Sequence, residues 1–205
     1  MKARAFKKST AIAAAGIVRY CCYFVILFMV FGMLLSALGR QTFSLRADSE
    51  HYERAFYSGA QKGEYGGSFT VQTNDDILVI ARDGKVYPGT QVVLFLMFAL
   101  DAIPKILAFC FLAKVFTNVS EDRIFIKENA SYLLYYGLLQ LFSAVIVPIL
   151  KLLICNVANM MLNNLIQLST GSGFLEKVFS GIAFIVASYI IHYGISLQDE
   201  VDHTI

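Results

Sequence analysis

The sequence QVVLFLMFALDAIPKILAFCFLAKVF, residues 91–116, decides the fold of this 205-residue chain. It is long and apolar enough to cross a bilayer, which takes about 20 helical residues. Asp101, Pro104 and Lys105 lie well inside it. An acid and a base four residues apart share one face of a helix, and each charge is costly alone in hydrocarbon. We therefore expect Asp101 and Lys105 to form an intramembrane ionic pair beside a proline kink.

Two roles for this pair stay open at the level of sequence. In the first, the pair faces a neighbouring helix and fixes how the helices pack, as buried ionic groups do in some proteins. In the second, the pair contacts a substrate or handles protons, as intramembrane ionisable residues often do. We favour the first role, an internal ionic pin.

The composition is that of an integral membrane protein. Hydrophobic residues make up 57% of the chain and charged residues 16%, whereas a soluble domain carries about a quarter charged residues. The formal net charge of +2 is too small to indicate direct nucleic-acid binding. At 205 residues, a single membrane domain spanning the whole chain is expected.

A basic lead precedes the first apolar run, residues 17–38. Lys2, Arg4, Lys7 and Lys8 place the amino terminus in the cytoplasm by the positive-inside rule. A signal peptide is the alternative, but its apolar core would be about 7–15 residues long and this run is longer. We therefore expect a retained transmembrane helix.

We predict an all-α membrane fold, a four-transmembrane-helix bundle with both termini cytoplasmic. The expected spans are 17–38, 91–116, 132–154 and 175–196. They are separated by an outer segment at 40–90, an inner loop at 117–131 and an outer loop at 155–174, and they are followed by a cytoplasmic tail at 197–205.

The outer segment is predicted to contain a short helix at 48–58 and a small β-hairpin or meander at 69–87, where β-rich runs alternate with turn residues. The outer loop has the composition of a short amphipathic helix followed by a flexible turn. Lys151 is expected to extend its ammonium outward from the third span.

Motifs for catalysis and metal binding are absent from the sequence. The four cysteines form no C-x-x-C pair, and no HExxH, GxSxG or GxxxxGK occurs. We therefore expect no enzymatic activity, no cofactor and no metal. Four spans without a visible internal repeat also argue against a carrier that acts alone.

Two short patches carry a family resemblance. In the inner loop, Phe125, Asn129, Leu133 and Gly137 recur at spacings of four. The tail HYGISLQDEVDHTI is similar to an ending written G-x-x-L-Q-x-E-x-D-L-T-I. His203 stands where Leu is usual, and the matching residues are Gly194, Leu197, Gln198, Glu200, Asp202, Thr204 and Ile205. Together these patches resemble the domain of unknown function 2975 family of bacterial four-span membrane proteins.

The resemblance implies no established biochemical activity. Members of that family are often encoded beside a small helix-turn-helix regulator, which implies a sensory or regulatory membrane partner of a cytoplasmic transcription regulator. Glu200 and Asp202 would then meet a basic partner, or dock on the chain's own basic lead. An accessory subunit of a transport or immunity system is the alternative. The expected partners are the lipid bilayer of the bacterial cytoplasmic membrane and a regulator or other membrane protein, with homo-oligomerisation left open.

Overall fold

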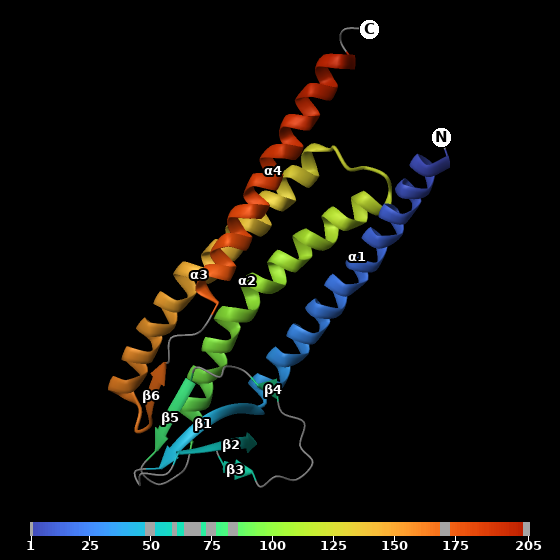
Figure 1. Cartoon of the computed structure of the whole chain (residues 1–205). Coiled ribbons are helices and arrows are strands. Elements are labelled where there is room, and N and C mark those ends of the chain that lie inside the picture. Colours follow the sequence, from blue (N-terminus) through green and yellow to red (C-terminus); the bar gives the residue numbers. More distant parts are fainter. Residues whose placement is uncertain are drawn as a thin grey trace. The chain divides into compact units, whose positions relative to one another are not determined.

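The computed structural model describes residues 2–47, 52–58, 61–63, 71–72, 77–81, 86–168 and 173–202 (Figure 1). Four long helices and six short strands occur within these ranges. The helices are α1 (Lys2–Ala37), α2 (Pro88–Ser120), α3 (Lys127–Met161) and α4 (Phe174–Asp202). The strands are β1 (Gln41–Ala47), β2 (Tyr52–Ser58), β3 (Gln61–Gly63), β4 (Val71–Gln72), β5 (Ile77–Ala81) and β6 (Leu165–Leu168).

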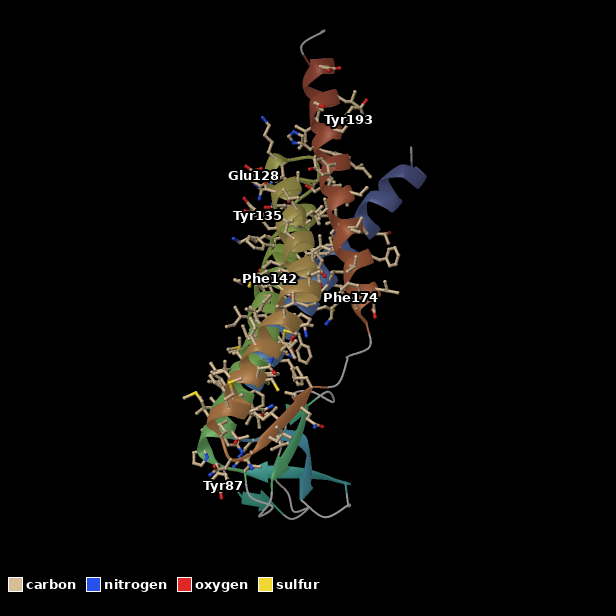
Figure 2. All side chains as sticks on the ribbon, turned by 90° about the vertical axis from the view of Figure 1, so that its left-hand side faces the viewer. Tyr87, Glu128, Tyr135, Phe142, Phe174 and Tyr193 are labelled. Atoms are coloured by element: carbon tan, nitrogen blue, oxygen red, sulfur yellow. The ribbon has the colours of Figure 1, made fainter. Side chains whose placement is uncertain are left out.

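Each of the four helices is long and apolar enough to cross a membrane. The apolar stretches are Ile12–Ala37, Pro88–Ser120, Lys127–Met161 and Phe174–Gln198. Large apolar side chains are exposed along these helices, among them Tyr135 and Phe142 of α3 and Tyr193 of α4 (Figure 2). Side chains of this kind suit a lipid environment rather than water. The chain is therefore a multi-pass membrane protein, and the prediction of four spanning helices is confirmed.

Two helices are each followed, two residues after their last residue, by a residue with a positive φ angle. Gly39 (φ 73°) follows α1, and the Arg40 amide donates to the Leu35 carbonyl at 3.0 Å. Asp122 (φ 64°) follows α2, and the Arg123 amide donates to the Asn118 carbonyl at 2.9 Å. Both ends have the hydrogen bonding of the Schellman motif, which pairs helix carbonyls that would otherwise lack a donor.

The chain's contacts divide it into two compact units, each described by itself. Unit 1 comprises Met1–Phe28, Pro104–Ala144 and Leu175–Ile205, and unit 2 comprises Met29–Ile103 and Val145–Phe174. Helices α1, α2 and α3 therefore contribute residues to both units. The prediction of one membrane domain stays a prediction.

The core of unit 1 joins four helices around Tyr136 of α3. The Tyr136 ring meets Phe184 of α4 at 4.4 Å between centroids and Phe109 of α2 at 6.4 Å. Both pairs have edge-to-face geometry, which aromatic rings prefer. Cys22 of α1 belongs to the same buried cluster, whose other buried members are Ala108, Leu112, Ala113, Val115 and Leu133.

Unit 2 contains a mixed sheet with the strand order β3-β2-β1-β5-β6, and β4 also pairs with β1 (Figure 1). β1 runs antiparallel to β2 and parallel to β5, and β5 runs antiparallel to β6. Val79 of β5 and Ile166 of β6 face each other in this pairing and are fully buried. With residues of α2 and α3 they form the core of this unit, which also contains Ile77, Val86, Leu94, Met97, Cys155 and Ala158.

Two local predictions were wrong. Tyr52–Ser58, expected at the end of a short helix, forms β2, where aromatic side chains suit a pleated surface; residues 48–51 lie outside the described residues. In the outer loop, α3 continues to Met161 and is followed by β6 rather than by an amphipathic helix. β4 and β5 each pair with β1, so the hairpin expected at 69–87 stays a prediction.

Candidate functional site

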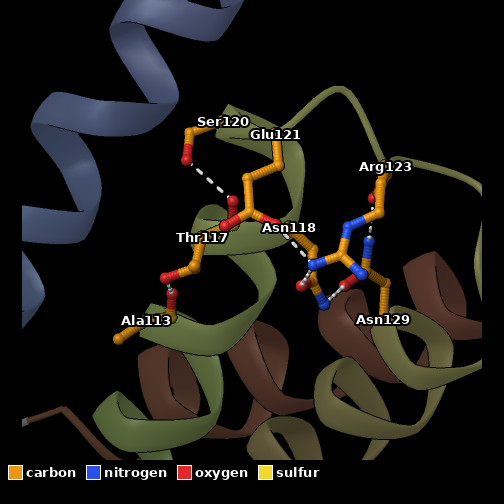
Figure 3. A network of polar contacts seen from close by, with 7 residues as sticks. All are labelled: Ala113, Thr117, Asn118, Ser120, Glu121, Arg123 and Asn129. Atoms are coloured by element: carbon orange, nitrogen blue, oxygen red, sulfur yellow. Dashed lines mark hydrogen bonds and ion pairs between the residues drawn. The ribbon is translucent and has the colours of Figure 1, made fainter.

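The inner loop between α2 and α3 is fixed by Asn129, whose side chain is fully buried. Its amide nitrogen donates to the carbonyl of Arg123 at 2.8 Å (Figure 3). It also donates to the carbonyl of Ile124 at 2.9 Å. Its amide oxygen accepts from the side chain of Asn118 at 2.8 Å. One carboxamide therefore satisfies two loop carbonyls and joins the start of α3 to the end of α2. Both the nitrogen and the oxygen of the buried Asn129 carboxamide therefore have hydrogen-bonding partners, as buried polar groups generally do.

Charged side chains lie on the outer side of the same loop. The Arg123 guanidinium donates to the Asn118 side chain at 3.2 Å and forms an ion pair with Glu121 (Figure 3). Both members of this ion pair are more than half exposed. Exposed pairs of this kind contribute about 1 kcal/mol or less. The order of the loop therefore depends on Asn129 more than on these charges.

The loop contacts α4 through Phe125 and Gly194. A β-carbon placed on Gly194 would lie 3.1 Å from two ring carbons of Phe125, so the absence of a side chain makes room for the ring. Near this contact, the Ser188 hydroxyl of α4 donates to the Ala130 carbonyl of α3 at 2.7 Å. The structure thus brings together one residue from each of the two motif patches.

The remaining inner-loop motif residues face the interior of unit 1. Leu133 is buried in the core around Tyr136. Gly137 lies where α3 meets α4, because a β-carbon there would be 2.7 Å from the Gly181 carbonyl oxygen. Phe125, Asn129, Leu133 and Gly137 therefore each contact another part of unit 1. The last three do so from one face of α3, whereas Phe125 lies in the loop before α3 begins at Lys127.

The tail motif is described only in part. Leu197, Gln198 and Glu200 are exposed near the end of α4. Asp202 is the last helical residue, but its side chain lies outside the described residues, as do Thr204 and Ile205. Neither docking of this tail on the basic lead nor docking on a partner is tested by these positions.

Asp101 of α2 forms an ion pair with Lys151 of α3. Their side chains are 16% and 13% exposed, so both charges are largely withdrawn from the surface of unit 2. From the sequence we expected Lys151 to extend its ammonium outward. In the structure this ammonium pairs with Asp101 instead. Sequence reasoning missed this partner because the two residues are 50 positions apart. A signal was available, since each charge stands inside an apolar span and each needs compensation. The Asp101–Lys105 pair stays a prediction.

Residues 77–205, more than half of the chain, match the family described as protein of unknown function (DUF2975). The chain belongs to the DUF2975 family. This confirms the resemblance inferred from the loop and the tail. The match begins at β5 and includes the inner loop, the Asp101–Lys151 pair and α4, whereas α1 and β1–β4 precede it. No curated protein and no solved structure matches this DUF2975 chain.

The DUF2975 chain also contains a buried polar cluster at the start of α2. Asn164, which directly precedes β6, accepts hydrogen bonds at its side-chain oxygen from the Tyr87 amide at 3.2 Å and the Thr90 hydroxyl at 2.7 Å. Asn164 and Thr90 are both fully buried. This cluster joins the first turn of α2 to the connection between α3 and β6. Sequence reasoning missed it, although an Asn-Asn pair beside an apolar run was visible.

A second polar cluster closes the outer edge of β6. The Asn159 side chain accepts from the Ile166 amide at 2.7 Å and donates to the Ile166 carbonyl at 2.8 Å. The Cys155 thiol also donates to that carbonyl, at 2.9 Å. Asn159 thus makes the two hydrogen bonds that a residue of a further strand would make.

These sites offer hydrogen-bonding groups and two ion pairs, of which one is exposed and one is largely buried. Of the residues that the structure describes, no three His, Cys, Asp or Glu side chains lie together as metal ligands. The expectations of no metal, no cofactor and no enzymatic activity stay predictions. What the DUF2975 arrangement offers is an ordered loop, an exposed helix end and a buried charge pair.

Proposed function

We propose that this DUF2975 protein is a sensory or regulatory protein of the bacterial cytoplasmic membrane, with both termini in the cytoplasm. In this proposal it engages a cytoplasmic transcription regulator through its inner loop and tail. The orientation is supported by the basic lead before the first span, since cytoplasmic flanks carry an excess of Lys and Arg.

The observation that carries the proposal is the buried Asn129 carboxamide. The fully buried Asn129 side chain bonds to two carbonyls of the loop and holds them in one arrangement. The fixed loop and the neighbouring end of α4 expose Ile124, Phe125, Leu197 and Glu200, which we call the loop–tail surface. A surface that is ordered before binding loses less conformational entropy when a partner binds.

The segment at 40–90 is proposed to be extracytoplasmic, to contain the hairpin predicted for it and to meet the signal. Its strand β5 pairs with β6, which lies in the connection between α3 and α4. In this proposal a change at the sheet reaches α3 through β6, the strand that follows α3 in the chain.

The test is whether the protein captures a cytoplasmic helix-turn-helix regulator, the partner that the family resemblance implies. Full-length tagged protein is purified from membranes with Glu200→Ala and Asp202→Ala combined. Loss of the acidic pair is expected to abolish capture of the regulator, because its basic surface would lose its counter-charges. Glu176→Ala, in the first turn of α4, is the matched control and should leave capture unchanged.

Unchanged capture by the double variant would remove the tail from the proposal. Absence of the regulator from preparations of the unchanged protein, with a membrane cross-linker present, would contradict the proposed function itself.

The second candidate function is an accessory subunit of a transport or immunity system. It is favoured by the Asp101–Lys151 pair, because ionisable groups inside spans often serve ion or substrate pathways. Cross-linking in membranes followed by mass spectrometry separates the two functions: a permease or ATPase subunit supports transport, and a transcription regulator supports the first proposal. Loss of a pH-dependent phenotype in Asp101→Asn, with assembly intact, would add proton handling.

A further inference from the structure

Lys114 of α2 lies against a cluster of aromatic rings on the outside of unit 1. Its ammonium nitrogen is 5.9 Å from the centre of the Phe111 ring and 5.3 Å from the centre of the Tyr132 ring. Phe111 stacks on Tyr132 at 6.0 Å and meets Tyr135 at 5.2 Å between centroids. The two distances from the ammonium nitrogen to the ring centres are within the range of cation–π attraction. Two turns of α2 and α3 therefore build one aromatic surface around a single cation.

The position of this cluster along the helices corresponds to the membrane interface. Lys114 is six residues before Ser120, the last residue of α2, or about 9 Å along the axis at 1.5 Å per residue. Tyr132 and Tyr135 are five and eight residues after Lys127, where α3 begins. Tyr side chains are enriched at this depth, where one end of the ring meets hydrocarbon and the other meets headgroups.

The polar groups of the cluster are available to a ligand. Lys114 is exposed, and it forms no ion pair with any described residue. Within the same described ranges, the hydroxyls of Tyr132 and Tyr135 have no hydrogen-bond partner in the protein, whereas the Tyr136 hydroxyl accepts from the Gln140 side-chain amide at 3.0 Å. One ammonium and two hydroxyl donors thus face the exterior from adjacent helices.

Apolar side chains continue the surface toward the middle of the helices. Leu107 lies one turn before Phe111 on α2, and Leu138 lies one turn after Tyr135 on α3; about half of each side chain is exposed. The same face of α3 carries Tyr135 and, further along, Phe142 (Figure 2). A ligand that fits has an anionic head at Lys114 and a hydrocarbon chain along the leucines.

We propose that Lys114, Tyr132 and Tyr135 bind the phosphate headgroup of an anionic glycerophospholipid, with Phe111 holding the Lys114 ammonium and the two tyrosine rings in place. The occupant is a bilayer lipid because the cation lies at headgroup depth with an exposed apolar strip beside it. A free phosphate would use the ammonium and leave that strip uncovered. Lipid binding at this site does not require the regulator, so its test is independent of the test of the proposed function.

The chain contains no tryptophan, which allows a site-specific fluorescence test. Leu138→Trp introduces one fluorophore beside the cluster without changing any of its four residues. The full-length variant is reconstituted in phosphatidylcholine vesicles with a minor fraction of dibrominated lipid, either phosphatidylglycerol or phosphatidylcholine. Stronger quenching by brominated phosphatidylglycerol is expected, corresponding to about a fivefold preference, since one basic residue at a membrane surface favours an anionic lipid to that extent.

Two further variants in the Leu138→Trp protein separate a site from general attraction. Lys114→Gln should abolish the preference, and Lys114→Arg should keep it because the charge remains over the rings. Lys177→Gln, which removes an equal charge from the first turns of α4, is the matched control and should keep the preference. Far-ultraviolet circular dichroism checks that each variant retains its helical content.

The proposal is overturned if brominated phosphatidylglycerol shows no preference in the parent variant, or if Lys114→Gln retains it. Equal losses in Lys114→Gln and Lys177→Gln would also overturn it, because they would indicate attraction to net charge. Competition by inorganic phosphate added to the vesicles would assign the cluster to a soluble anion instead.

Discussion

A β-carbon on Gly137 of α3 would lie 2.7 Å from the carbonyl oxygen of Gly181 on α4. The relation is reciprocal, since a β-carbon on Gly181 would lie 3.0 Å from the Gly137 carbonyl oxygen. Two helices in contact at backbone level gain van der Waals packing that larger side chains prevent, as is common in membrane helix pairs. The family motif glycine thus has a structural role in joining α3 to α4.

Replacement of Gly137 by Ala is expected to destabilise the protein by about 1–3 kcal/mol, the usual cost of overpacking a tight contact. The added methyl group meets the Gly181 carbonyl and the backbone of Ile185, neither of which is a flexible side-chain end. The measurement is the midpoint of thermal unfolding of the purified protein in detergent micelles.

Gly16→Ala in α1 is the matched control for Gly137→Ala. A β-carbon at Gly16 has no neighbouring atom within 4 Å, and Ala is the better helix former by about 1 kcal/mol. This variant should therefore unfold at the same temperature or a higher one. Equal losses for the two variants would contradict the close helix contact.

Asn129→Ala is expected to release the inner loop. The carbonyls of Arg123 and Ile124 lose their donor, and each unsatisfied buried group costs about 1–3 kcal/mol. Hydrogen exchange measured by mass spectrometry should show faster exchange across 121–126. Ser131→Ala removes an exposed hydroxyl that donates to the Lys127 carbonyl and should leave that exchange unchanged.

The partner of Asp101 is measurable by double-mutant cycles. Asp101→Asn or Lys151→Met alone removes one member of a largely buried ion pair, which costs about 3–5 kcal/mol, whereas the double variant recovers much of that loss. We expect a coupling energy of about 0.5–3 kcal/mol between Asp101 and Lys151 from unfolding in detergent. A parallel cycle with Lys105→Met tests the neighbour on the same helix. Additive losses for Asp101 and Lys151 would show that their ion pair contributes nothing to stability.

Asn159→Ala is expected to expose the outer backbone groups of Ile166. The amide of Ile166 would lose its hydrogen bond to the Asn159 side chain, and its exchange with solvent should rise roughly tenfold, in line with the net worth of one hydrogen bond. Asn156→Ala is the matched control, because Asn156 is an exposed asparagine on the same helix. An unchanged exchange rate at Ile166 would exclude this role of Asn159.

Composition and periodicity were sufficient for the spans because hydrocarbon permits few charges and satisfies no backbone group. The close approach of another helix at Gly137 was also expected from the sequence, since positions four apart share a helix face. Phe125 precedes α3, so its contact with Gly194 does not follow from helical spacing. The inner-loop patch was found from sequence, although the fully buried state of Asn129 was not.

Long-range polar partners could not be found in this way. Asp101 was assigned to Lys105 because sequence separation was the only available measure of proximity, and its ion pair with Lys151 was beyond that measure. Likewise Asn159 and Asn164 were assigned to an outer loop with the composition of a short amphipathic helix. Their partners, Ile166, Tyr87 and Thr90, were set by tertiary packing, which single-sequence patterns do not contain.

The carboxamide of Asn159 has a consequence for how copies of this protein meet. By occupying both backbone groups of Ile166, it covers those groups at the β6 edge of the sheet, and a strand from another molecule cannot pair with them. Growth of the sheet from one molecule into the next is thus opposed at the middle of β6. Asn159 acts there as a side-chain substitute for a neighbouring strand.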